Sequence, residues 1–425
     1  MSSSSGQRTK TRPAESIDLA SMDVHFESTR SRLGPIGAAL RLPLASYYLV
    51  MMSCLLLLAV GLLMVLSASS VLSSVKEGNS YYYMIKQCLF LAAGLPMAFA
   101  LSRCNERILR FLAWPAIILA GILLILVFTP MGVASYGNRA WLDLGPIRLQ
   151  PSELAKAALV LWSATVLSNR RRTLDQPKRL LFPYLVVAAL MLGLVLAERD
   201  LGTALVLGGI MVMMLWFVGA PASVLAGITS VAGLGGALLV VTNEERMRRI
   251  FGFLGAAGGS TSDQPLNAIY ALASGGWFGV GLGGSRQKWG GLKNGAQTDY
   301  IFAVLGEELG LLGTLTVICL FVVLGYAGFR IALRSTSSFW RLTAAGMTGW
   351  LMVQGLINIC VAMKMLPVIG LPLPFISYGG SALLANLIAA GILLAAARHE
   401  PEAIAVLAER SKRKPRVTGV VAPMR

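Results

Sequence analysis

Long apolar runs separated by short polar segments dominate the chain. Nine runs are long enough to cross a bilayer hydrocarbon core of about 30 Å as helices. They cover residues 46–72, 84–101, 111–130, 180–197, 201–218, 222–242, 300–328, 342–363 and 376–397. A tenth run, 154–168, is shorter and is preceded by the polar residues Ser152 and Glu153. The pattern predicts an all-α polytopic membrane protein of about ten spans, in which the short run also crosses.

Lys and Arg residues set the orientation, because basic residues in short loops stay on the cytoplasmic side. Basic residues flank the first and the last run, which places both termini inside and requires an even number of spans. We therefore expect a flexible cytoplasmic tail at 1–45, a ten-span membrane domain at 46–400 and a basic cytoplasmic tail at 401–425. Within the domain, 243–299 is the large extracytoplasmic loop between spans seven and eight.

Composition excludes a soluble domain, since 56% of the 425 residues are hydrophobic and only 13% are charged. The formal net charge of +17 raises the question of a nucleic-acid partner. Much of that charge lies in the tails and beside the apolar runs, so contact with anionic membrane lipids is the simpler interpretation, and no nucleic acid is expected. The first forty residues lack the short apolar core of a cleavable signal.

Cysteine and histidine usage removes several chemistries. Four of the five cysteines fall in apolar runs and Cys104 falls at a cytoplasmic end, so no disulfide framework or thiolate metal site is expected. The two histidines, His25 and His399, lie on cytoplasmic segments. Acid–base chemistry on the outer face must therefore use carboxylates, lysine or tyrosine.

The first polar outer loop, 136–156, contains Trp141, which either anchors at the membrane interface or contributes to a site. Lys156 lies inside the apolar run that follows, where a charge usually faces a cavity or a partner. Glu153 is three residues earlier on the same helical face, so an internal Glu153–Lys156 pair is the alternative. In the next outer turn, Asp200 either caps the helix that begins at Leu201 or belongs to the site.

The large loop ends in a glycine-rich stretch, 275–284, which we expect to be non-helical and able to approach a ligand closely. It lacks the signatures of nucleotide-binding phosphate loops, because no strand precedes it and no Gly-Lys-Ser or Gly-Lys-Thr follows. The third polar segment, 366–381, contains three prolines within eight residues. Non-helical backbone at membrane depth must be satisfied by protein or water, so this segment is expected to wall an outer cavity.

Asp299 falls where the large loop joins the next span. An aspartate there either caps the helix or presents an ionised carboxylate at the membrane boundary to whatever binds between loop and spans. Glu307 and Glu308 follow about 12 Å deeper along a helix, too far to pair closely with Asp299. We expect one of them to line or brace the cavity, and we give the role of base to Asp299.

Five stretches resemble, in order, the SEDS family (shape, elongation, division and sporulation), to which RodA and FtsW belong. They are "QPSELAK" at 150–156, "DLGTALV" at 200–206, "GGWFGVGLGGSRQK" at 275–288, "TDYIFAVLGEELGLLG" at 298–313 and "LPLPFISYGGSAL" at 371–383. The resemblance covers the chain from about residue 46 to 400. "VLSASSV" at 65–71 and "AARHEPEA" at 396–403 favour the actinobacterial division members, whereas "GLPLPFISYGG" is closer to elongation members.

The resemblance implies a bacterial plasma-membrane peptidoglycan glycosyltransferase that polymerises lipid II on the extracytoplasmic face. It implies a class B penicillin-binding protein and other division proteins as partners. The family's catalytic aspartate corresponds to Asp299. Several positions depart from the family pattern. Gln297 stands for a histidine, Ala140 for an arginine, with Arg139 one place earlier, and Arg199 for a proline. The stretch 252–263 is glycine-rich where the family tends to have proline and aspartate.

Inverting transfer to an acceptor hydroxyl needs one base, which typically contributes about 10²–10⁴-fold, and Asp299 is our candidate. The leaving diphosphate needs positive charge, and the sequence leaves the source open between basic side chains and a divalent cation (Mg²⁺ or Mn²⁺); no other cofactor is expected. The basic candidates are Lys156, Arg139, Arg246, Arg248, Arg249, Arg286 and Lys288. Candidate substrate-binding residues are Arg139, Trp141, Gln150, Ser152, Glu153, Lys156, Asp200, Gln264, Arg286, Lys288, Gln297, Thr298, Glu308, Ser377, Gly379, Gly380 and Ser381.

Two other classes of function remain open from the residues alone. A flippase or transporter of the lipid-linked precursor would use buried charges such as Glu153, Lys156 and Glu307 as a path across the bilayer. A non-catalytic division scaffold would use the polar outer loops to bind partners. The concentration of charges on the outer half of the spans counts against a path that crosses the membrane.

Overall fold

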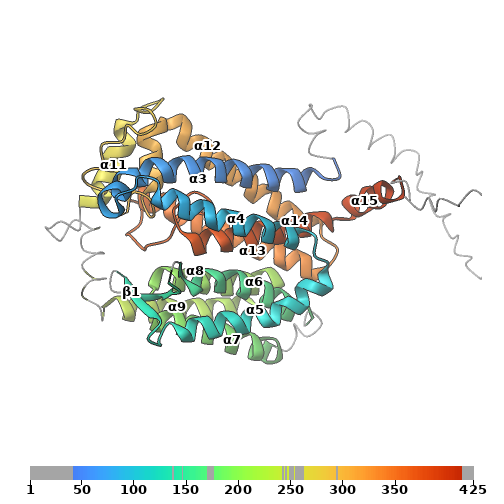
Figure 1. Ribbon diagram of the computed structural model, residues 1–425. Helices are drawn as coiled ribbons and strands as arrows, with labels where there is room; N and C mark the ends of the chain where they lie inside the picture. The colour runs from blue at the N-terminus through green and yellow to red at the C-terminus, as the bar shows by residue number, and fades with distance from the viewer. Residues whose placement is uncertain are drawn as a thin grey trace, which may run out of the picture.

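The computed structural model describes residues 42–135, 138–145, 147–169, 177–241, 244, 247, 253, 263–292 and 295–413, most of which form a bundle of long helices (Figure 1). In this part of the chain, seven helices are long and apolar enough to cross a membrane. Shorter apolar stretches occupy Phe182–Ala197 and Ala222–Ala237. A polytopic membrane protein, as the hydropathy pattern predicts, is therefore confirmed.

Each of the ten predicted runs coincides with one long helix, with ends shifted by a few residues. The ten are α3 (Ala45–Glu77), α4 (Tyr82–Ser102), α5 (Glu106–Leu126), α6 (Pro151–Asn169), α7 (Pro177–Ala197), α8 (Leu201–Val218), α9 (Ala222–Val241), α12 (Ile301–Arg334), α13 (Ser338–Ala362) and α14 (Gly380–Arg398). Shorter helices are α11 (Asp263–Ser274) and α15 (Pro401–Arg413).

A small antiparallel sheet contradicts the prediction of an all-α chain. Strands β1 (Gly132–Ser135), β2 (Asn138–Asp143) and β3 (Arg148–Leu149) pair in the order β1-β2-β3. Ala140 and Leu142 of β2 are buried, and their neighbours along the strand are more exposed. This alternation is the period of a strand, but it extends over too few residues to stand out among long apolar helices.

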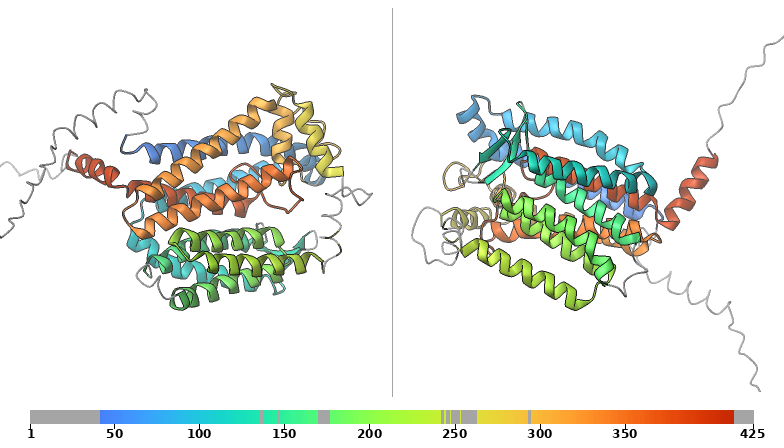
Figure 2. Two further views of the ribbon diagram at one scale, coloured as in Figure 1. Left: turned by 180° about the vertical axis from the view of Figure 1, so that it is seen from behind. Right: turned by 90° about the horizontal axis from the view of Figure 1, so that it is seen from below.

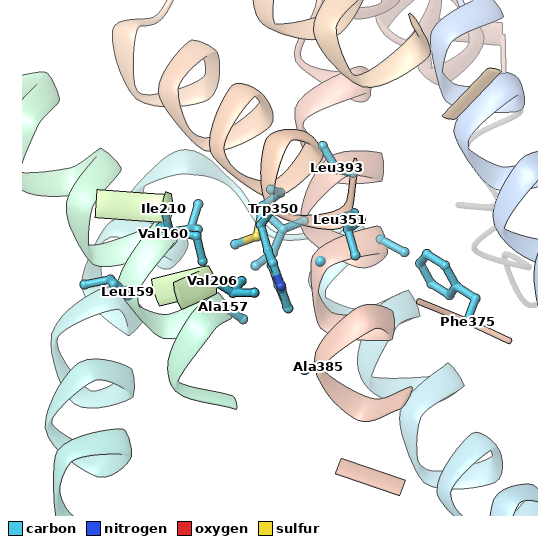
Figure 3. Close-up of a cluster of buried hydrophobic side chains, with 14 of the residues drawn as sticks. Ala157, Leu159, Val160, Val206, Ile210, Trp350, Leu351, Phe375, Ala385 and Leu393 are labelled. Atoms are coloured by element: carbon cyan, nitrogen blue, oxygen red, sulfur yellow. The ribbon is translucent and has the colours of Figure 1, made fainter. Parts of the chain in front are cut away.

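Helix α6, the short tenth run, lies among other helices and is buried along almost its whole length. Figure 3 shows Ala157 and Val160 of α6 near Val206 and Ile210 of α8, with Trp350 of α13 beside them. The side chain of Trp350 is fully buried. A helix that contacts protein rather than lipid tolerates polar side chains, which explains why this run is the least apolar of the ten.

The two ends of the bundle differ. At one end lie the sheet, α11 and the non-helical segment 366–379 (Figure 1). At the opposite end Arg110 bonds Asn169, Arg398 donates to the carbonyl of Ser102, and α15 projects away from the bundle (Figures 1 and 2).

The predicted tails are only partly described. Residues 1–41 and 414–425 lie outside the described residues. The start of the expected C-terminal tail is a helix, α15, which is held by an ion pair of 3.1 Å between Arg334 and Glu402 and by the buried side chain of Ala403. The tail as predicted therefore begins with an ordered helix, because Ala403 has a surface to pack against.

The glycine-rich stretch 275–284 is non-helical, as predicted, and fits into a kink of α12. The kink is at Gly310, whose φ of 70° and ψ of −165° break the helix. The amides of Val280 and Gly281 donate to the carbonyls of Glu307 and Glu308 at 2.9 and 3.1 Å. The loop backbone thus satisfies carbonyls that the kink releases from helical hydrogen bonding.

We expect Gly279→Ala to destabilise the protein strongly. A Cβ at Gly279 would lie 2.1 Å from the carbonyl oxygen of Glu308, and the residue has a φ of +79°. Gly283→Ala is the matched control, because Gly283 has a similar φ of +82° but open space around it. Positive φ alone costs about 1–2 kcal/mol, so the thermal midpoint in detergent should fall clearly further for Gly279→Ala. An equal fall of the thermal midpoint in the two variants would contradict the close packing of Gly279 against Glu308.

Candidate active site

Asp299 lies in a tight turn that leads into α12. The amides of Thr298 and Tyr300 both donate to the carbonyl of Gly295, at 3.1 and 2.9 Å. The first helical residue is Ile301 and the N-cap position is Tyr300, which makes no side-chain cap. The interpretation of Asp299 as the N-cap is therefore wrong, because the turn from Gly295 postpones the helix by one residue. The side chain of Asp299 is half-buried.

Donors from two other segments hold the backbone carbonyls of this turn. The carbonyl of Gln297 accepts from the amide of Tyr378 at 2.9 Å. The carbonyl of Thr298 accepts from Ser377 Oγ at 2.7 Å, and that of Asp299 accepts from Asn358 Nδ2 at 3.1 Å. The structure thus brings together the turn that contains Asp299, the end of α13 and the proline-rich segment, three stretches far apart in the sequence.

The proline-rich segment 366–379 is non-helical, as predicted, and enters the bundle. Phe375 has a φ of 65°, and its carbonyl oxygen packs against Gly61 in the middle of α3, where a Cβ would lie 2.4 Å away. Gln87 of α4 contacts the carbonyl of Ser377 and the amide of Gly379 at 3.4 and 3.3 Å. Protein groups therefore satisfy irregular backbone well inside the bundle.

The first polar loop, 136–156, joins the same region through Gln150. Its amide donates to Ser381 Oγ at 2.8 Å, and its Nε2 donates to Asp200 Oδ2 at 3.0 Å. Asp200 also caps α8 by accepting from the amide of Thr203 at 3.0 Å, so the capping interpretation of Asp200 is confirmed. Ser381, in the first turn of α14, is buried.

The Glu153–Lys156 pair is internal. Lys156 Nζ lies 2.8 Å from Glu153 Oε1 and 2.8 Å from Gln354 Oε1, and the ring of Trp350 lies 5.4 Å away. The exposed fractions of the Lys156 and Glu153 side chains are 0% and 2%. Gln354 Nε2 in turn donates to the carbonyl of Pro372 at 2.9 Å. The lysine therefore connects α6 to α13, and through Gln354 it is linked to the proline-rich segment.

Glu307 and Glu308 hold the large loop onto α12 and α3. Glu308 pairs with Lys288 at 2.9 Å and accepts from Ser67 Oγ. Glu307 accepts from Ser285 Oγ and from the amide of Arg286 at 2.9 Å. This is the bracing role that we expected for one of the two carboxylates, and both have it.

The remaining candidates are dispersed around this region. Arg139 and Arg286 are exposed, and the Arg139 guanidinium donates to the carbonyl of Thr129 at 2.8 Å. Trp141, Gln264, Gly379 and Gly380 are half-buried, and Ser152 is buried. Arg246, Arg248 and Arg249 lie outside the described residues.

Sequence reasoning missed Gln87, Gln354 and Asn358. Each is a buried amide inside a long apolar helix. Such a residue is a signal in its own right, because an uncharged polar group at membrane depth also requires a partner. The sequence would have shown that these amides need partners, but not which partners they have.

Glu198, in the turn between α7 and α8, is a further residue of this region that was not among the candidates. Its side chain is fully buried, and neither carboxyl oxygen has a hydrogen-bond partner among the described residues. Burial, with a smaller effect from the negative charge of Asp200, raises the pKa of Glu198 to about 8. Burial therefore favours the protonated form of this carboxyl group in the folded protein.

We expect Glu198→Gln to remove a pH dependence of stability. Because the folded pKa of about 8 exceeds the ordinary 4.5, Glu198 contributes its full stability below pH 4.5 and loses it as pH rises through 8. The variant should match wild type near pH 5 and exceed its thermal midpoint at pH 9, by on the order of 2–5 °C. Glu402→Gln, at a half-exposed surface pair, is the control. A constant difference between Glu198→Gln and wild type across this range would disprove the prediction.

Comparison with known proteins supports the resemblance. The family model described as cell cycle protein, FtsW/RodA/SpoVE, matches residues 47–402. The probable peptidoglycan glycosyltransferase FtsW of Mycobacterium tuberculosis is 38% identical over 374 residues, covering 87% of this chain and 71% of that protein.

Two solved structures are similar in fold. A chain of a peptidoglycan synthase complex, described as coordinating polymerization and crosslinking, has a TM-score of 0.68 and 28% identity, covering 83% of this chain and 97% of that chain. The rod shape determining protein RodA of Thermus thermophilus has a TM-score of 0.61 and 30% identity, covering 83% and 96%. The chain belongs to the FtsW/RodA/SpoVE family of cell cycle proteins, which confirms the resemblance on which the expected site was based.

Proposed function

We propose that this protein is a peptidoglycan glycosyltransferase that polymerises lipid II during cell division. The relative from Mycobacterium tuberculosis bears the name of that activity. The structural observation that carries the proposal is the position of Asp299. Its half-buried carboxylate follows a backbone turn bonded by both the proline-rich segment and α13, at the end of the bundle that holds the polar loops.

We propose that this end faces outside and that all ten long helices cross the membrane. Consecutive long helices joined by short turns reverse direction, and basic residues gather at the opposite end. Arg110, Arg334 and Arg398 make their contacts there. The rule that basic loops stay inside then places both ends of the chain in the cytoplasm of a bacterial cell.

Asp299 acts as the base in this proposal. The acceptor hydroxyl of one sugar attacks the anomeric carbon of another, the new C–O bond forms as the bond to diphosphate breaks, and the hydroxyl proton passes to the carboxylate. A single displacement inverts the configuration at the anomeric carbon and needs no covalent intermediate. No described histidine lies at this end, since His399 stacks on Trp340 beside α15.

Arg139 and Arg286 are the side chains that we propose for the leaving diphosphate, because both are exposed at the same end of the bundle. Lys156 and Lys288 are less suitable, since each is buried in an ion pair with a carboxylate. In the described part of the chain, no three His, Cys, Asp or Glu side chains gather around a possible metal position. A Mg²⁺ or Mn²⁺ ion held mainly by the diphosphate itself would need only one carboxylate and would supply positive charge to the leaving group.

The transporter alternative is less well supported. It needs charges that a substrate can reach along a path, but Glu153 and Lys156 bond each other, and Glu307 bonds the loop above it. The scaffold alternative remains compatible with the polar loops, and the activity measurement below separates it from an enzyme. A class B penicillin-binding protein is the proposed partner, together with other division proteins, because a similar chain occurs in a peptidoglycan synthase complex.

Purified protein supplied with lipid II, alone and with a cognate class B penicillin-binding protein, tests the proposal. We expect glycan strands that a muramidase digests, formed by one or both preparations. Absence of strands from both would reject the proposal. Translocation of lipid II by the same protein in liposomes would then favour the transporter, and its absence the scaffold.

A further inference from the structure

Three consecutive backbone carbonyls, those of Gln297, Thr298 and Asp299, accept hydrogen bonds from distant parts of the chain. The donors are the amide of Tyr378, Ser377 Oγ and Asn358 Nδ2. We infer that Asn358 and Ser377 are positioning residues that fix the carboxylate of Asp299 for the reaction. This inference rests on the proposed function, since it assigns a role to the surroundings of the proposed base.

The hydrogen bonds that Asn358 donates, rather than its packing, explain why an amide side chain occupies this buried position. Its Nδ2 donates to the carbonyls of Asp299 at 3.1 Å and Leu371 at 2.7 Å. Both contacts are to acceptors, so the amide nitrogen is the atom that must face them. Its Oδ1 is buried without a hydrogen-bond partner among the described residues, which costs free energy. Nδ2 of Asn358 thus makes two hydrogen bonds, whereas Oδ1 makes none among the described residues.

Ser377 joins the same two segments. Its hydroxyl donates to the carbonyl of Thr298 at 2.7 Å and accepts from the amide of Leu373 at 2.8 Å. Its side chain is 5% exposed, so water does not readily replace either bond. Asn358 and Ser377 therefore each tie the turn before α12 to the stretch 371–373.

These bonds constrain the direction in which the Asp299 side chain leaves the backbone. Fixing the carbonyls of Thr298 and Asp299 fixes the peptide planes on both sides of the Asp299 Cα, and hence its φ and ψ. A catalytic group must be held to within about 0.5 Å of its productive position. Movement of about 1 Å can cost on the order of 10² in rate. A change at Asn358 or Ser377 should therefore slow the reaction more than it weakens substrate binding.

The test compares polymerisation kinetics of Ser377→Ala, Ser377→Thr and Asn358→Leu in the full-length protein with lipid II. Leucine has the same branched arrangement of side-chain heavy atoms as asparagine and suits an apolar helix, but its methyl groups are larger. It removes both donors, and the thermal midpoint of the variant is measured beside its rate. We expect kcat to fall about 10-fold for Ser377→Ala and Asn358→Leu, with KM for lipid II within twofold of wild type. Threonine keeps the hydroxyl and should restore most of the rate.

Ser53→Ala is the matched control, since Ser53 is an equally buried serine whose hydroxyl bonds only within α3. Hydrogen exchange gives a readout that does not need activity. The amides of Thr298 and Tyr300 are bonded to Gly295, and their exchange should become faster in Ser377→Ala and Asn358→Leu but not in Ser53→Ala.

Combination with Asp299→Asn separates this inference from the proposed function. If Ser377 and Asn358 act through Asp299, adding Ser377→Ala to Asp299→Asn should lower kcat little further. Full kcat in Ser377→Ala and Asn358→Leu, with Asp299→Asn inactive, would overturn the inference and leave the proposed function intact. Full activity of Asp299→Asn would instead overturn the proposed base. The positioning role would also be overturned if kcat fell only in proportion to a lower thermal midpoint of the variants.

Discussion

Asp299→Asn and Asp299→Ala should reduce lipid II polymerisation by about 10²–10⁴-fold, because each removes the group proposed to take the hydroxyl proton. Asparagine has nearly the same shape as aspartate, so the backbone bonds to Ser377 and Asn358 should survive in that variant. Asp299→Glu keeps a carboxylate but moves it along the side chain by more than 1 Å. We therefore expect an intermediate rate for the glutamate variant.

The measurement is the initial rate of glycan-strand formation by purified protein with its partner, after the thermal midpoint of each variant has been matched to wild type. Asp143→Asn is the control, since Asp143 is a partly exposed carboxylate at the same end of the bundle, 3.6 Å from Arg148. It should stay within twofold of wild type. Equal activity of wild type and Asp299→Asn would remove Asp299 from the mechanism.

Local sequence information was sufficient for features that depend on near neighbours. The run predicted at 201–218 coincides with α8, and Asp200 caps it, because both follow from hydropathy and from a contact three residues away. The Glu153–Lys156 pair is of the same kind, at three residues along one helix. For Asp299 the location at the start of a span was right and the capping role was wrong by one residue. The turn that begins at Gly295, which Ser377 and Asn358 hold through distant contacts, determines that the N-cap of α12 is Tyr300 and not Asp299.

Features that depend on distant contacts could not be predicted from one sequence. Asn358 contacts a residue 59 positions away, and Gln87 contacts one 290 positions away. Each is visible in the sequence only as an amide in an apolar run that needs a partner. The sheet escaped prediction for a different reason, because strands of two to six residues carry too little periodicity. The sequence thus predicts which segments form the functional region, but not which hydrogen bonds join them.

Lys156→Met should destabilise the folded protein by on the order of 3–5 kcal/mol, because it leaves the buried carboxylate of Glu153 without its cation. Methionine has a similar length and no charge, so lost volume contributes little. The double variant Glu153→Gln, Lys156→Met should recover most of this loss, since no unpaired charge then remains among α6, α13 and the proline-rich segment. Thermal or denaturant unfolding in detergent of these two variants and of Glu153→Gln alone completes a double-mutant cycle.

The double variant also separates bracing from substrate binding, which the single variants do not. If Lys156 serves only to hold α6 to Gln354, a stable double variant should polymerise lipid II with KM close to wild type. If Lys156 instead reaches the diphosphate, the same stable variant should bind lipid II weakly, and its KM should rise at least 10-fold. We expect the first result, because the lysine is fully buried and both of its bonds, to Glu153 and to Gln354, are 2.8 Å long. A raised KM with stability restored would return Lys156 to the group of substrate-binding cations and would require the bundle to open at α6 when substrate binds.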